Sequence, residues 1–344
     1  MYKIIIAILI SCGLIGVWFF YSEIYTAEAQ KAEKVEFIIE PGESVTALSE
    51  RLEQNQIIRH AWIFRKYLAL KNLDIKIRAG EFQVESPITL TRVAAALKNP
   101  SQSEREITII PGWTLRDIAT YFEKEEIATK KEFYDLLGEP AVNYKTVLGG
   151  PKVLFELEVF SDKPKYVSFE GYFAPDTFRV FADASLEEII KKLMKHRDDQ
   201  FTDQMYEDIK KSNRTVFEVI TIASILEKEV RGLEDKKIVS DLFWRRYDSN
   251  WALQADSTVH YAVGTDGSVF TKKEDRESTS PWNTYKYLGL PIGPISNPSI
   301  ESIMAAIYPE KNDYWYFLTT LDTGEVKYGK TLEQHNANVQ KYLR

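Results

Sequence analysis

The chain has 344 residues, of which 44% are hydrophobic and 28% are charged, a balance typical of globular proteins. With 44 basic and 51 acidic residues the net charge is −7, which disfavours nucleic acid as a partner because phosphate binding needs a basic surface. A single Cys excludes a disulfide framework and a cysteine-based zinc site, and the four His residues lack metal-binding spacing, so we predict no metal site.

The first feature in chain order is an uncharged apolar run over residues 4–21. A helix of this length would span ~27 Å, about the thickness of a bilayer core. Lys3 precedes the run and Glu23 follows it, so the positive-inside bias keeps residues 1–3 in the cytoplasm. We predict a single-pass anchor in the cytoplasmic (inner) membrane with the rest of the chain exported. A lipoprotein cleavage box ending at Cys12 and a cleaved signal peptide fit less well, because the apolar run continues without a small-residue site.

An internal repeat follows the anchor and a polar stalk over residues 22–35. Each copy reads as an apolar strand, a Pro-Gly turn, a hydroxyl cap and an amphipathic helix. The first copy has its strand at residues 37–39, its cap at Ser44 and its helix at 45–52; the second has its strand at 107–110, its cap at Thr114 and its helix from Leu115. Between the copies we expect helices over 61–70 and 90–97 and a strand over 79–84.

The repeated unit resembles the LysM module, a small βααβ fold that binds N-acetylglucosamine polymers. We therefore predict a LysM-like region over residues 36–130. A generic α+β module without affinity for sugars gives the same pattern, because turn and capping chemistry alone produce it.

The last domain is expected over residues 165–344, after a connecting segment at 131–164 with turn signals near Gly149 and Pro164. Capping boxes open two of its helices, Ser185 with Glu188 and Thr215 with Glu218. The second of these helices, over 215–230, is apolar on nearly every side and is therefore predicted to be buried.

Two acids near the end of this buried helix, Glu227 and Glu229, are candidates for chemistry. Both lie behind apolar residues, and spacing alone does not choose between them. Desolvation and the negative end of the helix dipole both raise the pKa of such a carboxyl. An acid that stays protonated near neutral pH suits proton transfer to a glycosidic oxygen. A salt-bridged or surface Glu at a helix end is the alternative.

Three loop-like stretches, residues 253–259, 281–285 and 289–298, combine amides, hydroxyls and aromatic rings. These groups are the ones that bind carbohydrate, although simple core packing also explains the aromatic side chains. In the third stretch Asn297 is predicted to cap a helix whose first residue is Pro298.

Six ordered motifs together are similar to the YceG-like (MltG) family of endolytic murein transglycosylases. They are Glu170-Gly171-Tyr172-Phe173-Ala174-Pro175-Asp176-Thr177-Phe178, Ala223-Ser224-Ile225-Leu226-Glu227-Lys228-Glu229, Leu253-Gln254-Ala255-Asp256-Ser257-Thr258-Val259, Asn283-Thr284-Tyr285, residues 289–298, and Thr331 with His335-Asn336. The resemblance implies an α+β fold: an N-terminal transmembrane helix, a LysM-like α+β module and a C-terminal mixed α+β catalytic domain. The chain departs from the family pattern at Ile292 and Ser257, where a Pro is usual.

The resemblance also implies a reaction without any cofactor. A single Glu, which corresponds to Glu227, protonates the glycosidic oxygen between N-acetylmuramic acid and N-acetylglucosamine. The 6-hydroxyl of the muramic acid then attacks its own anomeric carbon and leaves a 1,6-anhydro end. Substrate-binding candidates are Glu170, Gln254, Asp256, Asn283, Thr284 and Tyr285.

The implied partners are the glycan strands of peptidoglycan, together with penicillin-binding proteins and other wall-synthesis proteins, and the implied role is to end the elongation of nascent strands. Two alternatives stay open. One is a non-catalytic peptidoglycan-binding scaffold. The other is a muramidase-type hydrolase, in which Asp256 acts as a second carboxylate.

Overall fold

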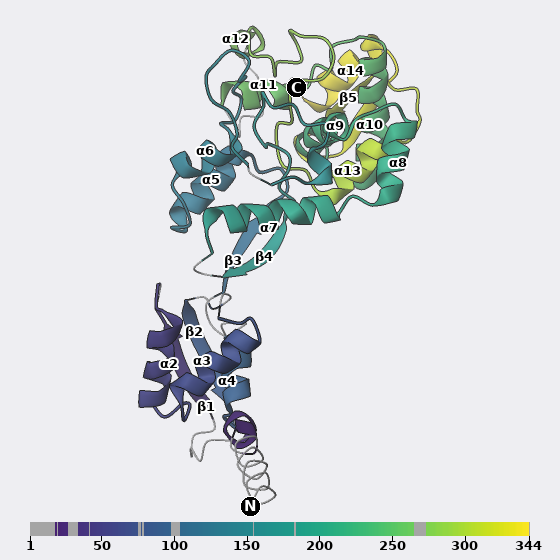
Figure 1. The fold of residues 1–344 in the computed structure, drawn as a ribbon. Helices are drawn as coiled ribbons and strands as arrows, with labels where there is room; N and C mark the ends of the chain where they lie inside the picture. The colour runs from purple at the N-terminus through teal and green to yellow at the C-terminus, as the bar shows by residue number, and fades with distance from the viewer. Residues whose placement is uncertain are drawn as a thin grey trace, which may run out of the picture. The chain divides into compact units, whose positions relative to one another are not determined.

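The structure is a computed structural model that describes residues 18, 20–26, 34–40, 42–74, 77, 79–97, 104–153, 155–181, 184–264 and 273–343 (Figure 1). The chain divides into two units: unit 1 is Met1–Glu106 with Arg179–Ala184, and unit 2 is Ile107–Phe178 with Ser185–Arg344. The predicted anchor lies almost wholly outside the described residues. No helix within the described ranges is long and apolar enough to cross a membrane.

The described part of unit 1 includes two antiparallel strands and the helices that follow them. The strands are β1 (Lys34–Ile39) and β2 (Gly80–Glu85), with Lys34 opposite Glu85 and Ile39 opposite Gly80. The helices are α2 (Val45–Gln54), α3 (Ala61–Leu70) and α4 (Leu90–Ala96). Ser44 caps α2 by accepting a hydrogen bond from the backbone N–H of Ala47, as predicted. The order βααβ with a further helix therefore follows the elements expected from the sequence.

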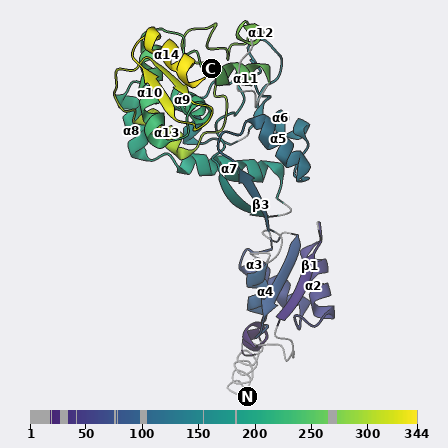
Figure 2. The ribbon, with the colours of Figure 1, turned by 180° about the vertical axis from the view of Figure 1, so that it is seen from behind.

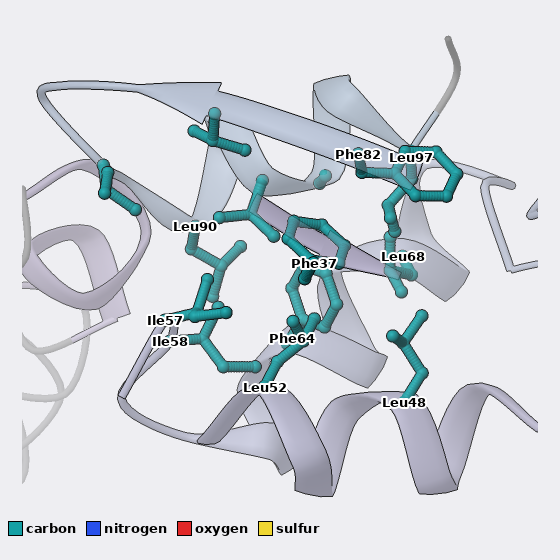
Figure 3. Close-up of a cluster of buried hydrophobic side chains, with 14 of the residues drawn as sticks. Phe37, Leu48, Leu52, Ile57, Ile58, Phe64, Leu68, Phe82, Leu90 and Leu97 are labelled. Carbon is teal, nitrogen blue, oxygen red and sulfur yellow. The ribbon is translucent and has the colours of Figure 1, made fainter. Parts of the chain in front are cut away.

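The core of unit 1 lies between the sheet and its helices (Figure 3). The rings of Phe37 on β1 and Phe82 on β2 stack with their centroids 5.6 Å apart. Leu48 and Leu52 of α2 and Phe64 of α3 are at most 1% exposed. Burial of these side chains is the main stabilising contribution to so small a unit, at about 2 kcal/mol for each large apolar side chain.

The second copy of the repeat does not build a second module of this kind. Its strand, β3 (Glu104–Ile109), pairs with β4 (Asp176–Phe181), and the division between the units falls within both strands. Its helix, α5 (Leu115–Lys124), belongs to unit 2 and packs against α6 (Lys130–Leu137). The division between the units thus falls at residue 106, inside the predicted LysM-like region 36–130, and the second copy belongs to unit 2 from Ile107 onward.

Unit 2 holds the remaining elements, which form a mixed α+β arrangement (Figures 1 and 2). They are the short η1 (Glu158–Phe160), α7 (Leu186–Asp199), α8 (Asp203–Lys211), α9 (Val216–Glu229), α10 (Leu233–Asp248), α11 (Asp256–Val263), α12 (Lys273–Arg276), α13 (Ile300–Ile307), β5 (Tyr316–Thr319), β6 (Val326–Gly329) and α14 (Leu332–Tyr342). Strands β5 and β6 are antiparallel.

Helix α9 lies at the centre of unit 2. It packs against α8, α10, α11 and α13, and every residue from Val219 to Leu226 is buried. Both predicted capping boxes are present, at Thr215 with Glu218 for α9 and at Ser185 with Glu188 for α7. An apolar helix surrounded on all sides holds its end firmly, so a side chain in its last turn has a well-defined position.

The predicted cap at Asn297 is wrong. Helix α13 begins at Ile300, and Ser299 is its N-cap, accepting from the backbone N–H of Ser302. The Asn297 amide is used elsewhere: its oxygen accepts from the backbone N–H of Phe173, and its nitrogen donates to Trp113 and Glu170. These tertiary partners take the side chain away from the helix end.

Candidate active site

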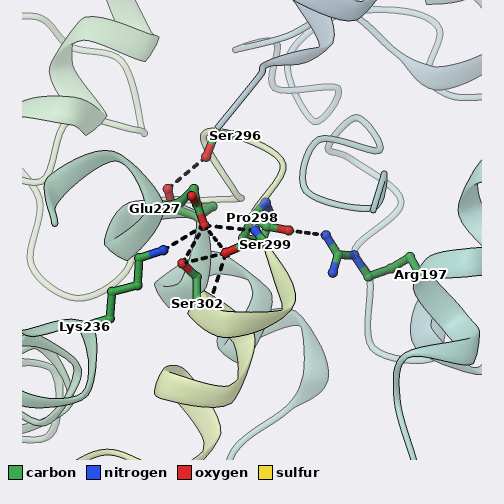
Figure 4. Close-up of polar contacts among 8 residues, drawn as sticks. Arg197, Glu227, Lys236, Ser296, Pro298, Ser299 and Ser302 are labelled. Atoms are coloured by element: carbon green, nitrogen blue, oxygen red, sulfur yellow. Dashed lines mark hydrogen bonds and ion pairs between the residues drawn. The ribbon is translucent and has the colours of Figure 1, made fainter. Parts of the chain in front are cut away.

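Glu227 lies in the last turn of α9, with its side chain only 10% exposed. Four donors reach one of its oxygens, Oε2 (Figure 4). They are the backbone N–H of Ser299 at 2.9 Å, the Ser299 hydroxyl at 2.6 Å, the Ser302 hydroxyl at 2.6 Å and the Lys236 ammonium at 3.2 Å. The donors come from α10 and from the start of α13, so three helices meet at this carboxyl.

The expectation that apolar neighbours keep Glu227 protonated is wrong. Burial raises the pKa of this carboxyl, but the hydrogen bonds from the two serines and the charge of Lys236 lower it more. The net pKa of Glu227 lies below its ordinary value, so the group is ionised at neutral pH in the free protein. The sequence showed the apolar residues of α9 and not the polar groups that approach from other elements.

Glu229, two residues further on, has the opposite behaviour. Burial raises the pKa of its carboxyl more than its hydrogen bonds lower it. Its Oε1 accepts from the Ser257 hydroxyl at 2.6 Å and from the Ser257 backbone N–H at 3.2 Å. This contact ties the end of α9 to the segment that carries Gln254 and Asp256.

Glu170 is a buried structural centre of unit 2, with 1% of its surface exposed. Its carboxyl accepts from the backbone N–H of Leu115 at 3.0 Å, from the Tyr261 hydroxyl at 3.1 Å and from the Asn297 amide at 3.1 Å. Burial raises its pKa to about 8. A saccharide has no surface to touch here, so the structure corrects the prediction that Glu170 binds substrate.

The adjacent Gly171 shows how tightly this motif packs against α9. Its φ is +91°, and a Cβ at this position would lie 2.8 Å from Ile220 Cγ2 and 2.8 Å from Pro294 Cβ. Only glycine fits both the left-handed backbone and the space. Gly171 therefore allows this backbone to pack closely between α9 and the Pro-rich loop.

Of the predicted substrate-binding residues, Gln254, Asp256 and Tyr285 keep some exposed surface. Gln254 is exposed and has a φ of 54°, an uncommon conformation for a residue other than glycine. Its neighbours Leu253 and Ala255 are both buried, which holds this backbone in place. The Tyr285 hydroxyl donates to Asp256 Oδ1 at 2.8 Å, and Arg276 lies 3.4 Å from the same oxygen. Burial and the charge of Asp256 raise the pKa of Tyr285.

Asn283 and Thr284 are at most 1% exposed and hold loops instead of facing solvent. The Asn283 amide donates to the carbonyls of Arg276 and Ser278, each at 2.9 Å. The Thr284 hydroxyl accepts from the Ala255 backbone N–H at 3.1 Å. Both side chains are buried and hold these loops together, which argues against the predicted direct contact of Asn283 and Thr284 with saccharide.

Four residues around Glu227 were not found from the sequence: Arg197, Lys236, Ser299 and Ser302. The serines, spaced three apart after a Pro, carry the signature of a helix start, but nothing marks them as neighbours of Glu227. Within the described ranges, no three His, Cys, Asp or Glu side chains lie close enough together to hold a metal ion.

The turn of the second repeat copy also reaches the site. A Cβ on Gly112 would lie 3.7 Å from Glu227 Cγ, and the Lys228 ammonium lies 3.4 Å from the Gly112 carbonyl. The backbone N–H of Gly112 donates to the Asn297 carbonyl at 2.9 Å, and that of Asn297 donates to the Trp113 carbonyl at 2.7 Å. The predicted LysM-like copy thus contributes to the surroundings of the candidate acid.

Comparison with known proteins finds one family and relatives that share one name. The profile of the YceG-like family matches residues 37–341. The endolytic murein transglycosylase of Bacillus subtilis (strain 168) is 31% identical over 334 residues, covering 96% of this chain and 91% of the relative. The protein of the same name from Streptococcus pneumoniae serotype 2 (strain D39) is 27% identical, covering 99% of this chain and 64% of the relative.

A solved structure is similar as well. The crystal structure of a yceG-like protein from Listeria monocytogenes is 30% identical and matches with a TM-score of 0.56. The match covers 89% of this chain and 99% of that one.

Proposed function

Because this chain belongs to the YceG-like family, we propose that it is an endolytic murein transglycosylase, a lyase that cleaves within the glycan strands of peptidoglycan. The observation that carries the proposal is the match over residues 37–341, which includes α9 and every residue that contacts Glu227. The relatives that bear this name are similar over nearly the whole of this chain.

Glu227 is the proposed acid. In its protonated form it donates to the glycosidic oxygen between N-acetylmuramic acid and N-acetylglucosamine, and the bond from that oxygen to the muramic anomeric carbon breaks. The 6-hydroxyl of the same muramic acid then forms a bond to that carbon and returns its proton to Glu227. The 6-hydroxyl replaces the proton that Glu227 gives up, so neither water nor a second carboxylate is needed. Because this hydroxyl belongs to the same sugar, it has a high effective concentration.

The ionised resting state of Glu227 fits this role in one way. A glycan bound over the carboxyl removes water from it, and this further desolvation favours the protonated form. Glu227 is then protonated only when substrate covers it. Burial raises the pKa of Glu227 and its hydrogen bonds lower it. A ligand that adds to the burial therefore raises this pKa further.

We propose Gln254, Asp256 and Tyr285 as the residues that contact saccharide, since all three are accessible and polar. Glu170, Asn283 and Thr284 would act by holding the loops in place, because each is buried.

Product analysis tests the proposed reaction. Purified peptidoglycan digested by the protein is expected to carry 1,6-anhydromuramic ends, detected by mass spectrometry. Products heavier by one water would identify a hydrolase and contradict the proposal. Strands that stay uncut, with the protein still bound, would identify a scaffold.

We further propose that residues 4–21 anchor the chain in the cytoplasmic membrane and that unit 1 binds glycan, next to the machinery that extends nascent strands. The apolar run supports the anchor. A groove of about 630 Å³ on unit 1, lined in part by Phe37, Arg51 and Asn55, supports the second proposal. Sedimentation checks both: removing residues 1–21 should release the chain from membranes, and removing residues 22–103 as well should weaken binding to insoluble peptidoglycan. Unchanged sedimentation in either case contradicts the corresponding assignment.

A further inference from the structure

We propose that Lys236, Ser299 and Ser302 are positioning residues that fix Glu227 through Oε2 alone, and that Oε1 is the oxygen that exchanges the proton with the glycan. The inference rests on the proposed function of Glu227 and adds to it the residues that orient the acid. Nothing in the family match assigns these three residues a role.

The two oxygens of the carboxyl have different surroundings. Oε2 receives four donors between 2.6 and 3.2 Å. Within the part of the chain that the structure describes, Oε1 has no hydrogen-bond partner. This oxygen is not fully buried. The 10% of the side chain that stays exposed therefore includes Oε1. An oxygen already holding four donors has no free lone pair for a proton, whereas Oε1 does.

The donors are themselves held by rigid elements. Ser299 is the N-cap of α13 and Ser302 lies three residues on, so both hydroxyls and the Ser299 N–H lie at the positive end of that helix. Lys236 of α10 is 3% exposed, with its ammonium directed at Glu227 (Figure 4). A donor set placed on packed helices fixes the carboxyl in one orientation and keeps Oε1 pointing the same way.

Arg197 supports this arrangement indirectly, through the residue before Ser299. It is fully buried on α7 and donates to the carbonyls of Phe173 and Pro298, the latter being the residue before Ser299. Its guanidinium thus fixes the peptide whose N–H reaches Glu227 Oε2. We place Arg197 as a structural support and not among the groups that touch the acid.

The charged groups that act on Glu227 are few. Helix α10 supplies Lys236, and α7 supplies Arg197, whose pKa burial lowers to about 9 while Glu227 opposes that shift. Helix α13 supplies only hydroxyls and an N–H, the turn before α5 supplies the uncharged Gly112, and Asp256 of α11 acts on Glu229 instead. Lys236 is therefore the charge whose removal should change the titration of Glu227 most.

The test compares the titration of Glu227 with the pH dependence of cleavage. The carboxyl pKa is measured by ¹³C NMR on the full chain labelled at Glu side chains, with Glu227→Gln identifying the resonance. In Lys236→Met we expect this pKa to rise by about 1 unit, the low end of the effect of a neighbouring opposite charge. The alkaline limb of kcat/KM should move up in pH by the same amount. Ser302→Ala should shift both in the same direction.

Controls separate positioning from general damage. Lys236→Arg keeps the charge and should leave the limb in place. Lys237→Met and Ser240→Ala make the same substitutions on α10 at residues that do not contact Glu227, and both profiles should match the wild type. A change that merely destabilises the fold lowers the plateau without moving the limb.

Two results would overturn the inference: an unchanged Glu227 pKa in both Lys236→Met and Ser302→Ala, or a shifted pKa with an unmoved activity limb. Failure of the proposed function itself looks different. In that case Glu227→Gln cleaves strands as fast as the wild type, whatever the NMR titration shows.

Discussion

Replacing Glu227 by glutamine is expected to lower the rate of strand cleavage about 10³-fold, the middle of the range for loss of a general acid. Glutamine has nearly the same shape, and its carbonyl oxygen can still accept from Ser299 and Ser302. It has no acidic proton to give to the glycosidic oxygen. The measurement is the initial rate of release of soluble fragments from purified peptidoglycan.

The structure predicts a second consequence of this substitution, which a control must remove. Lys236 has 4% of its side chain exposed and pairs with Glu227, so glutamine leaves a buried ammonium without its counter-charge. Loss of one partner of a buried pair costs about 3 kcal/mol of folding free energy. The double variant Glu227→Gln with Lys236→Met removes both charges and should regain most of this stability, measured by urea unfolding, while it stays inactive.

The double variant therefore separates chemistry from folding. If it cleaves strands at the wild-type rate, Glu227 is not the acid and the site has to be sought elsewhere, with Glu229 as the next candidate because of its raised pKa. If only the single variant is inactive, the loss came from the unpaired Lys236.

The second large effect concerns the pH dependence of stability and arises at Glu170. Burial raises the pKa of Glu170 from 4.5 to about 8. Between pH 4.5 and about pH 8, this carboxyl therefore binds a proton when the chain folds. The associated stabilisation is complete below pH 4.5 and is lost as the pH rises through about 8. A pKa difference of about 3.5 corresponds to about 5 kcal/mol. In Glu170→Gln, which imitates the protonated acid, this part of the pH dependence should disappear.

The measurement is the free energy of unfolding of both proteins at a series of pH values from 4.5 to 8.5. Wild type and Glu170→Gln should be similar at the acid end, and the variant should be the more stable at the alkaline end. Glu277→Gln, at an exposed position, is the matched control and should follow the wild-type curve. Equal slopes for all three proteins would show that Glu170 is not protonated in the folded state.

Much of the fold could be predicted because the signals are local. The capping boxes at Ser185 and Thr215 join residues three positions apart, and both are present in the structure. The ends of the predicted helices of unit 1 lie within two residues of the observed ends. The domain division could not be predicted in this way. The second repeat copy has the same local pattern as the first, but its helix α5 packs against α6 and belongs with it to unit 2.

At the candidate site, a buried apolar helix that ends in two acids could be predicted from local patterns, since helical periodicity and caps depend only on near neighbours. The protonation state of each acid depends instead on contacts that form when the chain folds. The donors that ionise Glu227 lie up to 75 positions away in the chain, and the contact that holds Glu229 spans 28. Hydrogen bonds and charges set a carboxyl's pKa over a few ångströms of space, and residues so distant in sequence come within that range only after the chain has folded.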